Sequence, residues 1–325
     1  MKLLLKCLMA AVLPALVALG GAVHAQQWPV RPVRIIVPFP PGQAADIITR
    51  VIAERLTPAL GQQVIVDNRP GAGAALGTEL AAKAVADGYT FLAGGSAALA
   101  INPHLYKNLG YDTLRDFAPV TQLVDIAMAF VVNSGHPAQN LNDFIQLAKQ
   151  RPGQLNYGSS GSGSTSHLVT AALAQRAGIT LSHVPYKGAV QALTDLMSGQ
   201  VNLVADTPPT VIPHLQFKKL RAIATSMARR VPQLPDVPTV DEQGIPGYNL
   251  NTWTSIVAPK ATPEPILGRM GAEIVKIIAH PDVQKRLIEI GFIPVGSSRE
   301  QFAAFLSGEY ATWAKVVQAA GAKVE

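Results

Sequence analysis

One kind of segment occurs twice in this chain: a short apolar strand that runs into a loop of small residues and opens a helix. The first copy is IIVPFPPGQAAD, residues 35–46, and the second is LNYGSSGSGSTSH, residues 155–167. A helix that begins after such a loop has free N–H groups in its first turn, and its dipole attracts anions there. Two such anion cradles, far apart in the chain, can face each other across a cleft.

The second copy nearly matches a phosphate-binding loop, with Gly158 and Gly163 at the required spacing. That motif needs Lys at the position of Ser164, because the Lys neutralises the outer phosphates. Without it a nucleotide's charge would be uncompensated, and a singly charged carboxylate fits better. An ordinary Gly/Ser turn between a strand and a helix explains the same residues, so both interpretations stay open at this point.

Strands and helices alternate along most of the chain, which predicts an α/β fold with mostly parallel sheets flanked by helices. Ligands of such sheets bind at the carboxyl ends of the strands, where both loops lie. The expected strands are residues 33–38, 63–67, 90–93, 128–133, 155–158, 181–186, 201–205, 220–225 and 251–259. The expected helices are residues 47–56, 71–86, 141–150, 164–177, 189–198, 263–279, 281–290 and 298–319.

The first 25 residues are predicted to be a cleavable secretory signal. They carry Lys2 and Lys6, then an apolar run, and end in Val23-His24-Ala25, which places cleavage after Ala25. The single cysteine, Cys7, lies within this segment, so the mature chain has no thiol. Cysteine nucleophiles, disulfides and thiolate metal sites are thereby excluded, and export without cysteine points to a bacterial periplasm.

The 325 residues are long enough for about two domains, and we expect two lobes. Lobe 1 is assigned residues 26–126 and 247–325, and lobe 2 residues 127–246. Removal of the signal takes two Lys and no acid from a net charge of +6, leaving +4 with no long basic run. No nucleic-acid partner is therefore expected.

Enzyme, metal and cofactor sites find little support in the residue pattern. The histidines are scattered singly, so no metal site is expected. The glycines of residues 71–77 resemble a dinucleotide-binding turn, but the third comes one residue late, so we expect a tight turn and no cofactor. Ser96, after Gly94-Gly95, weakly resembles a hydrolase nucleophile elbow, yet no acid–histidine pair stands out from the spacing. We expect Ser96 to donate a hydrogen bond to a ligand.

Several short motifs together resemble one known family, through their order and spacing over nearly all the mature chain. They are VPFPPG (37–42) with Asp46 and Arg50, NRPGAG (68–73), DGYT (87–90), NP (102–103) with LY (105–106), YGSSG (157–161) with HL (167–168), VPYKG (184–188) and LPDVPT (234–239). This set resembles the Bug family of periplasmic solute-binding proteins, the receptors of tripartite tricarboxylate transporters. The resemblance implies a two-lobed, type II-like binding fold with the ligand in the interdomain cleft.

The resemblance also implies the ligand-binding residues. The loop around Gly42 would hold the proximal carboxylate, often through bridging water, and the loop of Ser160–Thr165 would complete the site. With candidates chosen from strand ends, the expected site is Phe39, Gly42, Gln43, Ala44, Ser96, Ser160, Gly161, Ser162, Gly163, Ser164, Thr165 and Asp206. Gln43 stands where the family usually has a second glycine, and it can donate to a ligand oxygen or narrow the pocket.

Two acidic residues near the expected site are interpreted differently. Asp206 ends a strand and can accept a hydrogen bond from a ligand amine or hydroxyl, or else cap a nearby loop. Asp46 lies near a helix N-terminus, where a carboxylate is favourable on its own account, so it is assigned a structural role.

The predicted function is a monomeric, non-catalytic receptor that carries a small organic carboxylate to a membrane permease. The alternatives are a secreted hydrolase with Ser96 or Ser160 as nucleophile, and a sensor relay in which the loaded protein docks on a signalling ectodomain. Dicarboxylate, aromatic carboxylate, amino acid and nicotinate-like acid all remain open as ligands.

Overall fold

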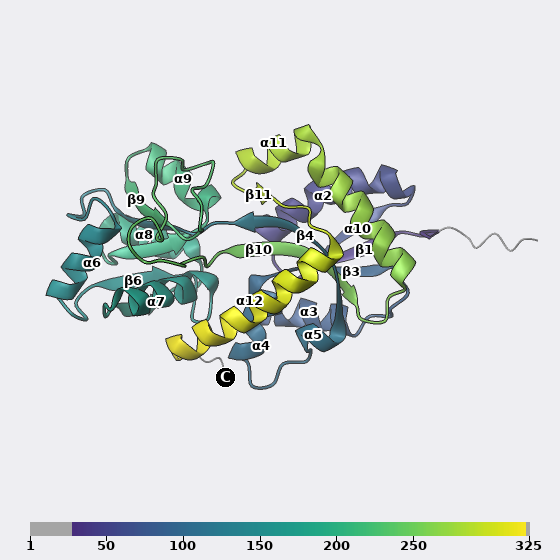
Figure 1. Cartoon of the computed structure of the whole chain (residues 1–325), viewed down its shortest axis with the longest axis horizontal. Helices are drawn as coiled ribbons and strands as arrows, with labels where there is room; N and C mark the ends of the chain where they lie inside the picture. The colour runs from purple at the N-terminus through teal and green to yellow at the C-terminus, as the bar shows by residue number, and fades with distance from the viewer. Residues whose placement is uncertain (1–27, 323–325) are drawn as a thin grey trace, which may run out of the picture.

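The computed structural model describes residues 28–322, which form two β-sheets flanked by helices (Figure 1). The predicted signal segment, residues 1–25, lies outside the described residues. The six-stranded sheet has the order β11-β4-β10-β3-β1-β2 and the five-stranded sheet the order β7-β6-β8-β5-β9. The two sheets confirm the predicted α/β fold with two groups of strands.

The six-stranded sheet takes its strands from both ends of the chain. They are β1 (Val33–Val37), β2 (Val64–Asn68), β3 (Thr90–Gly95), β4 (Phe117–Ile126), β10 (Thr252–Pro259) and β11 (Ile293–Pro294). The five-stranded sheet uses only the middle of the chain. Its strands are β5 (Ala129–Asn133), β6 (Asn156–Ser159), β7 (Ser182–Pro185), β8 (Leu203–Asp206) and β9 (Leu220–Thr225). The exact lobe boundaries stay a prediction.

Both sheets are mixed, which corrects the expectation that they are mostly parallel. β1 is parallel to β2 and β3, but β10 is antiparallel to β3 and β4. β6 is parallel to β7 and β8, but β5 is antiparallel to β8 and β9. Parallel neighbours need a crossover connection, usually a helix. β5 follows β4 after only Ala127 and Met128, and an irregular segment leads into β10, so neither strand is preceded by such a helix.

The helices begin and end at the residues that their local chemistry favours. α2 (Ala44–Leu60) ends at Gly61 with φ 68°, α7 (Thr165–Ala177) at Gly178 with φ 62°, and both are left-handed C-caps. The remaining α-helices are α3 (Ala75–Ala82), α4 (Asn102–Leu105), α5 (Thr113–Asp116), α6 (Leu141–Gln150), α8 (Ala189–Ser198), α9 (Pro208–Gln216), α10 (Glu264–Ala279), α11 (Pro281–Glu289) and α12 (Arg299–Ala320). A short 3₁₀ helix, η1 (Ala72–Ala74), and a π-helical segment, η2 (Ala97–Ile101), complete the described helices.

The helix expected at residues 71–86 is shorter than predicted. α3 begins only at Ala75, because Gly71, Gly73 and Ala74 have φ values of 142°, 58° and 79°, which a right-handed helix does not accommodate. β4, α4, α5, α9 and β11 are present in addition to the predicted elements. None of the helices described within residues 28–322 is long and apolar enough to cross a membrane.

One apolar core extends from the first sheet to the second. It contains Ile36 and Leu92 of the six-stranded sheet together with Phe130 and Leu203 of the five-stranded sheet. α12 contributes five large side chains to this shared core: Phe302, Leu306, Trp313, Val316 and Val317 (α12 in Figure 1). Fully burying each large side chain of this kind stabilises the fold by about 1.5–3 kcal/mol. The two sheets are thus joined through a shared core as well as through their connecting strands.

Candidate functional site

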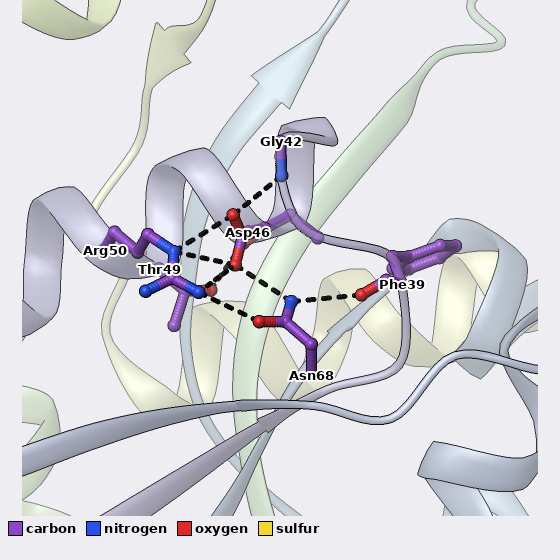
Figure 2. A network of polar contacts seen from close by, with 7 residues as sticks. Phe39, Gly42, Asp46, Thr49, Arg50 and Asn68 are labelled. Atoms are coloured by element: carbon purple, nitrogen blue, oxygen red, sulfur yellow. Dashed lines mark hydrogen bonds and ion pairs between the residues drawn. The ribbon is translucent and has the colours of Figure 1, made fainter.

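The loop between β1 and α2 is closed by the side chain of Asp46, which lies in the first turn of α2 (Figure 2). Its carboxylate accepts hydrogen bonds from the Gly42 N–H, from Arg50 Nε and from Asn68 Nδ2, each at 2.9 Å. Asn68 also donates to the carbonyl of Phe39 at 3.1 Å and accepts from Arg50 Nη2 at 2.9 Å. The network ties the loop to the end of β2.

Asp46 therefore has the structural role that its position predicts. Burial of its side chain favours the neutral acid, but the hydrogen bonds from Arg50, Gly42 and Asn68 and the charge of Arg50 outweigh that effect and lower the pKa. The carboxylate stays ionised and its hydrogen-bonding capacity is used within the loop. It also accepts from the N–H of Gly42, which the sequence predicts to be free for a ligand.

The donors left free at this end of α2 belong to the helix itself. Gln43 is the N-cap residue, with extended backbone, and its exposed side chain makes no capping hydrogen bond. The N–H groups of Ala44, Ala45 and Asp46 have no acceptor among the described residues. Gly42 allows this arrangement through its φ of 84°, in the left-handed region. Three N–H groups thus remain for an anion.

The loop between β6 and α7 satisfies many of its own polar groups. The N–H of Ser160 donates to Ser166 Oγ at 3.0 Å, and the N–H of Gly163 donates to His167 Nδ1 at 3.0 Å. Ser164 is the N-cap, and its hydroxyl donates to the Gly161 carbonyl at 2.6 Å and accepts from the His167 N–H at 3.3 Å. The predicted free N–H groups of Ser160, Gly161 and Gly163 are therefore engaged, the second of them with Ser159 Oγ.

The free donors of this loop lie at one loop position and at the start of the helix. Ser162, which is exposed, and the first two helical residues, Thr165 and Ser166, have N–H groups without an acceptor among the described residues. Gly163 adopts φ 77° and Gly161 φ 132°, conformations that glycine tolerates best. The second helix N-terminus thus resembles the first in chemistry, and neither loop contains Lys or Arg.

Two imidazole rings stack beneath this second loop. The rings of His167, in α7, and His183, in β7, are 3.9 Å apart between centroids and nearly parallel, at 3°. His183 Nε2 lies 2.6 Å from Ser159 Oγ, and the ring of Tyr157 lies 4.9 Å from that of His183 and 6.2 Å from that of His167. Burial, and then the neighbouring His183, lower the pKa of His167 to about 4, so His167 is neutral and its Nδ1 accepts from Gly163. A lone histidine carries no sequence pattern, and His183 reaches this position because β7 pairs with β6.

The serines considered as nucleophiles are not placed for catalysis. Ser96 is fully buried, and its hydroxyl lies 2.8 Å from Thr252 Oγ1; its expected hydrogen bond to a ligand stays a prediction. Ser160 bonds to Ser166 Oγ through its hydroxyl and has no histidine partner among the described residues. Ser159 does lie beside His183, yet it is fully buried and also bonds to the Gly161 carbonyl. A substrate would have no access to that hydroxyl.

Asp206 does cap a neighbouring turn, one of the two roles that its sequence position allows. Its Oδ1 accepts from the Thr207 N–H at 2.6 Å and from Thr210 Oγ1 at 2.9 Å, at the start of α9. Burial raises the pKa of this carboxyl, while the bonds from Thr207 and Thr210 oppose the rise. Its Oδ2 has no partner among the described residues.

The remaining features do not form a second candidate site. Phe39 is partly buried and packs against the apolar cores on both faces of the six-stranded sheet. An open depression of about 520 Å³ lies beside α4 and the end of α12, and none of the predicted site residues lines it. In residues 28–322, no three His, Cys, Asp or Glu side chains are grouped so as to hold a metal ion.

Comparison with known proteins agrees with this architecture. Residues 48–322 match the model of the tripartite tricarboxylate transporter family receptor. Protein BugT of Bordetella pertussis is 35% identical over 312 residues, which covers 96% of this chain and 96% of that protein.

Two solved structures with bound carboxylates are similar to this chain. One is a protein of R. palustris with adipate, with a TM-score of 0.81 and 36% identity over 91% of this chain and 99% of that one. The other is MatC of Rhodopseudomonas palustris with bound malate, with a TM-score of 0.76 and 30% identity over 89% of this chain and 100% of that one.

Proposed function

The chain belongs to the tripartite tricarboxylate transporter receptor family, and we propose that it is a periplasmic receptor for a small organic carboxylate. The receptor binds its solute between the two lobes and delivers it to the membrane subunits of a tripartite permease. It carries out no reaction on the solute.

The observation that carries the proposal is the pair of helix N-termini that follow β1 and β6. At the start of α2 the N–H groups of Ala44–Asp46 have no acceptor among residues 28–322. At the start of α7 the same holds for the N–H groups of Thr165 and Ser166. Helix N-termini bind anions through these N–H groups and the helix dipole. Because neither loop contains Lys or Arg, the arrangement favours a carboxylate over a multiply charged phosphate.

The proposed contacts come from both loops. On the β1–α2 side they are the N–H groups of Ala44 and Ala45, the side chain of Gln43, and Phe39 as an apolar wall. On the β6–α7 side they are Ser162, Thr165 and the backbone shaped by Gly163. The carboxylates bound by the R. palustris protein and by MatC support the same ligand class for this chain.

A thermal-shift screen of the purified mature protein against organic acids, sugars and phosphates tests the proposal. A ligand at a hundred times its dissociation constant stabilises the native state by about 2.7 kcal/mol, so a true ligand raises Tm clearly. At least one organic acid should do so, and mass spectrometry should recover it unchanged after prolonged incubation. Stabilisation by sugars or phosphates alone, or conversion of the acid, would overturn the receptor function proposed here.

A further inference from the structure

Asp206 stands beside the second loop, at the carboxyl end of the five-stranded sheet. β6 and β8 are parallel neighbours, with Tyr157 opposite Leu203 and Gly158 opposite Val204. Continuing this register by two residues places Asp206 alongside Ser160, where the β6–α7 loop begins. β6 ends at Ser159 and β8 ends at Asp206, so Asp206 lies level with the first residue of the β6–α7 loop.

The side chain of Asp206 is largely buried, and only one of its two carboxylate oxygens carries described hydrogen bonds. The side chain is only 8% exposed, and every hydrogen bond described for it ends on Oδ1. No Lys or Arg forms an ion pair with it among residues 28–322. A carboxylate can accept about four hydrogen bonds, and Oδ2 is not among the fully buried side-chain atoms without a partner in residues 28–322, so a ligand donor can reach it. Oδ2 is therefore an acceptor that gains from a donor brought by a ligand.

We propose that Asp206 makes the protein selective for organic acids that carry a hydroxyl or ammonium donor near the carboxylate. The inference rests on the proposed function: the ligand carboxylate occupies the N–H groups of the loops, and the donor binds Asp206 Oδ2. An unsubstituted acid lacks that donor and leaves the aspartate without a partner. Sites built around a hydrogen bond discriminate strongly against ligands that cannot make it.

The test compares matched acids by isothermal titration with the mature protein. The probes are succinate, malate and aspartate, and adipate, 2-hydroxyadipate and 2-aminoadipate, which differ within each series only in the donor. In the series that binds, the substituted acid should bind the parent about tenfold to a hundredfold more tightly than the unsubstituted one. In Asp206→Asn, the affinities for the substituted and the unsubstituted acid should differ by no more than about threefold. The variant should bind the unsubstituted acid as tightly as the parent or more tightly.

Thr210→Val is the matched control, because it removes one bond to Oδ1 and leaves Oδ2 unchanged. Its ligand preference should equal that of the parent. Equal affinity of the parent for substituted and unsubstituted acids would overturn the inference, and this result needs no variant. An unchanged ratio in folded Asp206→Asn would also overturn it. If no acid of either series or of the broader screen binds, the receptor function itself fails, which is a distinguishable result.

Discussion

His167 and His183 lie face to face at 3.9 Å beneath the β6–α7 loop, and His167 holds the N–H of Gly163 through Nδ1. Both rings have a pKa below the usual value, His167 at about 4, mainly because they are buried. A proton on Nδ1 would remove the acceptor for Gly163 and place a charge next to a second imidazole. The shape of this loop therefore depends on a neutral histidine pair.

Stability should fall as the solution is acidified through the titration range of these histidines. The folded pKa of His167, about 4, is below the unfolded value of 6.5, so the unfolded chain binds more protons between the two. This contribution to folding stability is complete above about pH 6.5 and is lost progressively towards pH 4, about 3 kcal/mol in total. Melting temperatures from pH 8 to pH 4.5 should show this fall in the parent and a shallower one in His167→Gln. Parallel curves would contradict the assignment.

Asp125 should make folding stability depend on pH in the opposite direction. It lies on β4 opposite Trp253 of β10, and burial followed by the charge of Glu309 raises its pKa to about 6. Because the folded pKa exceeds the unfolded one, this group costs stability as pH rises from about 4 to 6, and the cost is complete above that range. Asp125→Asn should therefore stabilise the protein at pH 8 by about 1–3 kcal/mol and change little at pH 4. Urea denaturation at both pH values measures the difference, and equal effects would count against it.

The glycines before α2 and α7 should matter more for binding than for folding. Gly42 and Gly163 have φ values of 84° and 77°, which a β-branched residue adopts only with strain. Gly42→Val and Gly163→Val should displace the free N–H groups and weaken carboxylate binding about tenfold to a hundredfold in isothermal titration.

Gly61 and Gly178 are matched controls for these variants. They cap the far ends of the same two helices, with φ values of 68° and 62°, and open space surrounds an added Cβ at both. Gly61→Val and Gly178→Val should lose a similar amount of stability and keep their affinity. If all four variants bind alike, these loops are not the ligand site.

Asp46 should be needed for the fold of the first loop rather than for ligand charge. Asp46→Ala removes the acceptor for Gly42, Arg50 and Asn68, and each bond to a charged group contributes about 1.5–3 kcal/mol. We expect a loss of at least about 2 kcal/mol in urea denaturation at pH 7. Asp143→Ala, which removes a carboxylate from the exposed first turn of α6, should cost less. A loss no larger than that of the control would show that the network contributes little.

Ligand binding should compact the molecule. A solute that contacts both loops binds the closed arrangement better and shifts the population towards it. Small-angle scattering should show a smaller radius of gyration with saturating ligand than without it. An unchanged radius, with binding confirmed by titration, would count against a site between the lobes.

Local sequence determined the parts of this protein that depend on neighbouring residues. The apolar spacing from Ile48 to Leu56 and the glycines at both ends specify α2, since burial on one face and left-handed φ values are local properties. The same reasoning applies to the β6–α7 unit, and it located both loops. Local pattern does not predict β4, because the polar residues Thr121, Gln122 and Asp125 interrupt its apolar run. It does not predict α9 either, because that helix contains three prolines.

Tertiary structure decided which polar groups of the loops remain free. The sequence indicated that the N–H groups of Gly42 and Gly163 were available, but side chains one helical turn later occupy both. His183 comes under the loop only because β7 pairs with β6. The mixed pairing of β5 and β10 likewise follows from which strands meet in space. Hydrogen bonds between distant segments depend on how the strands assemble, and no local periodicity encodes that assembly.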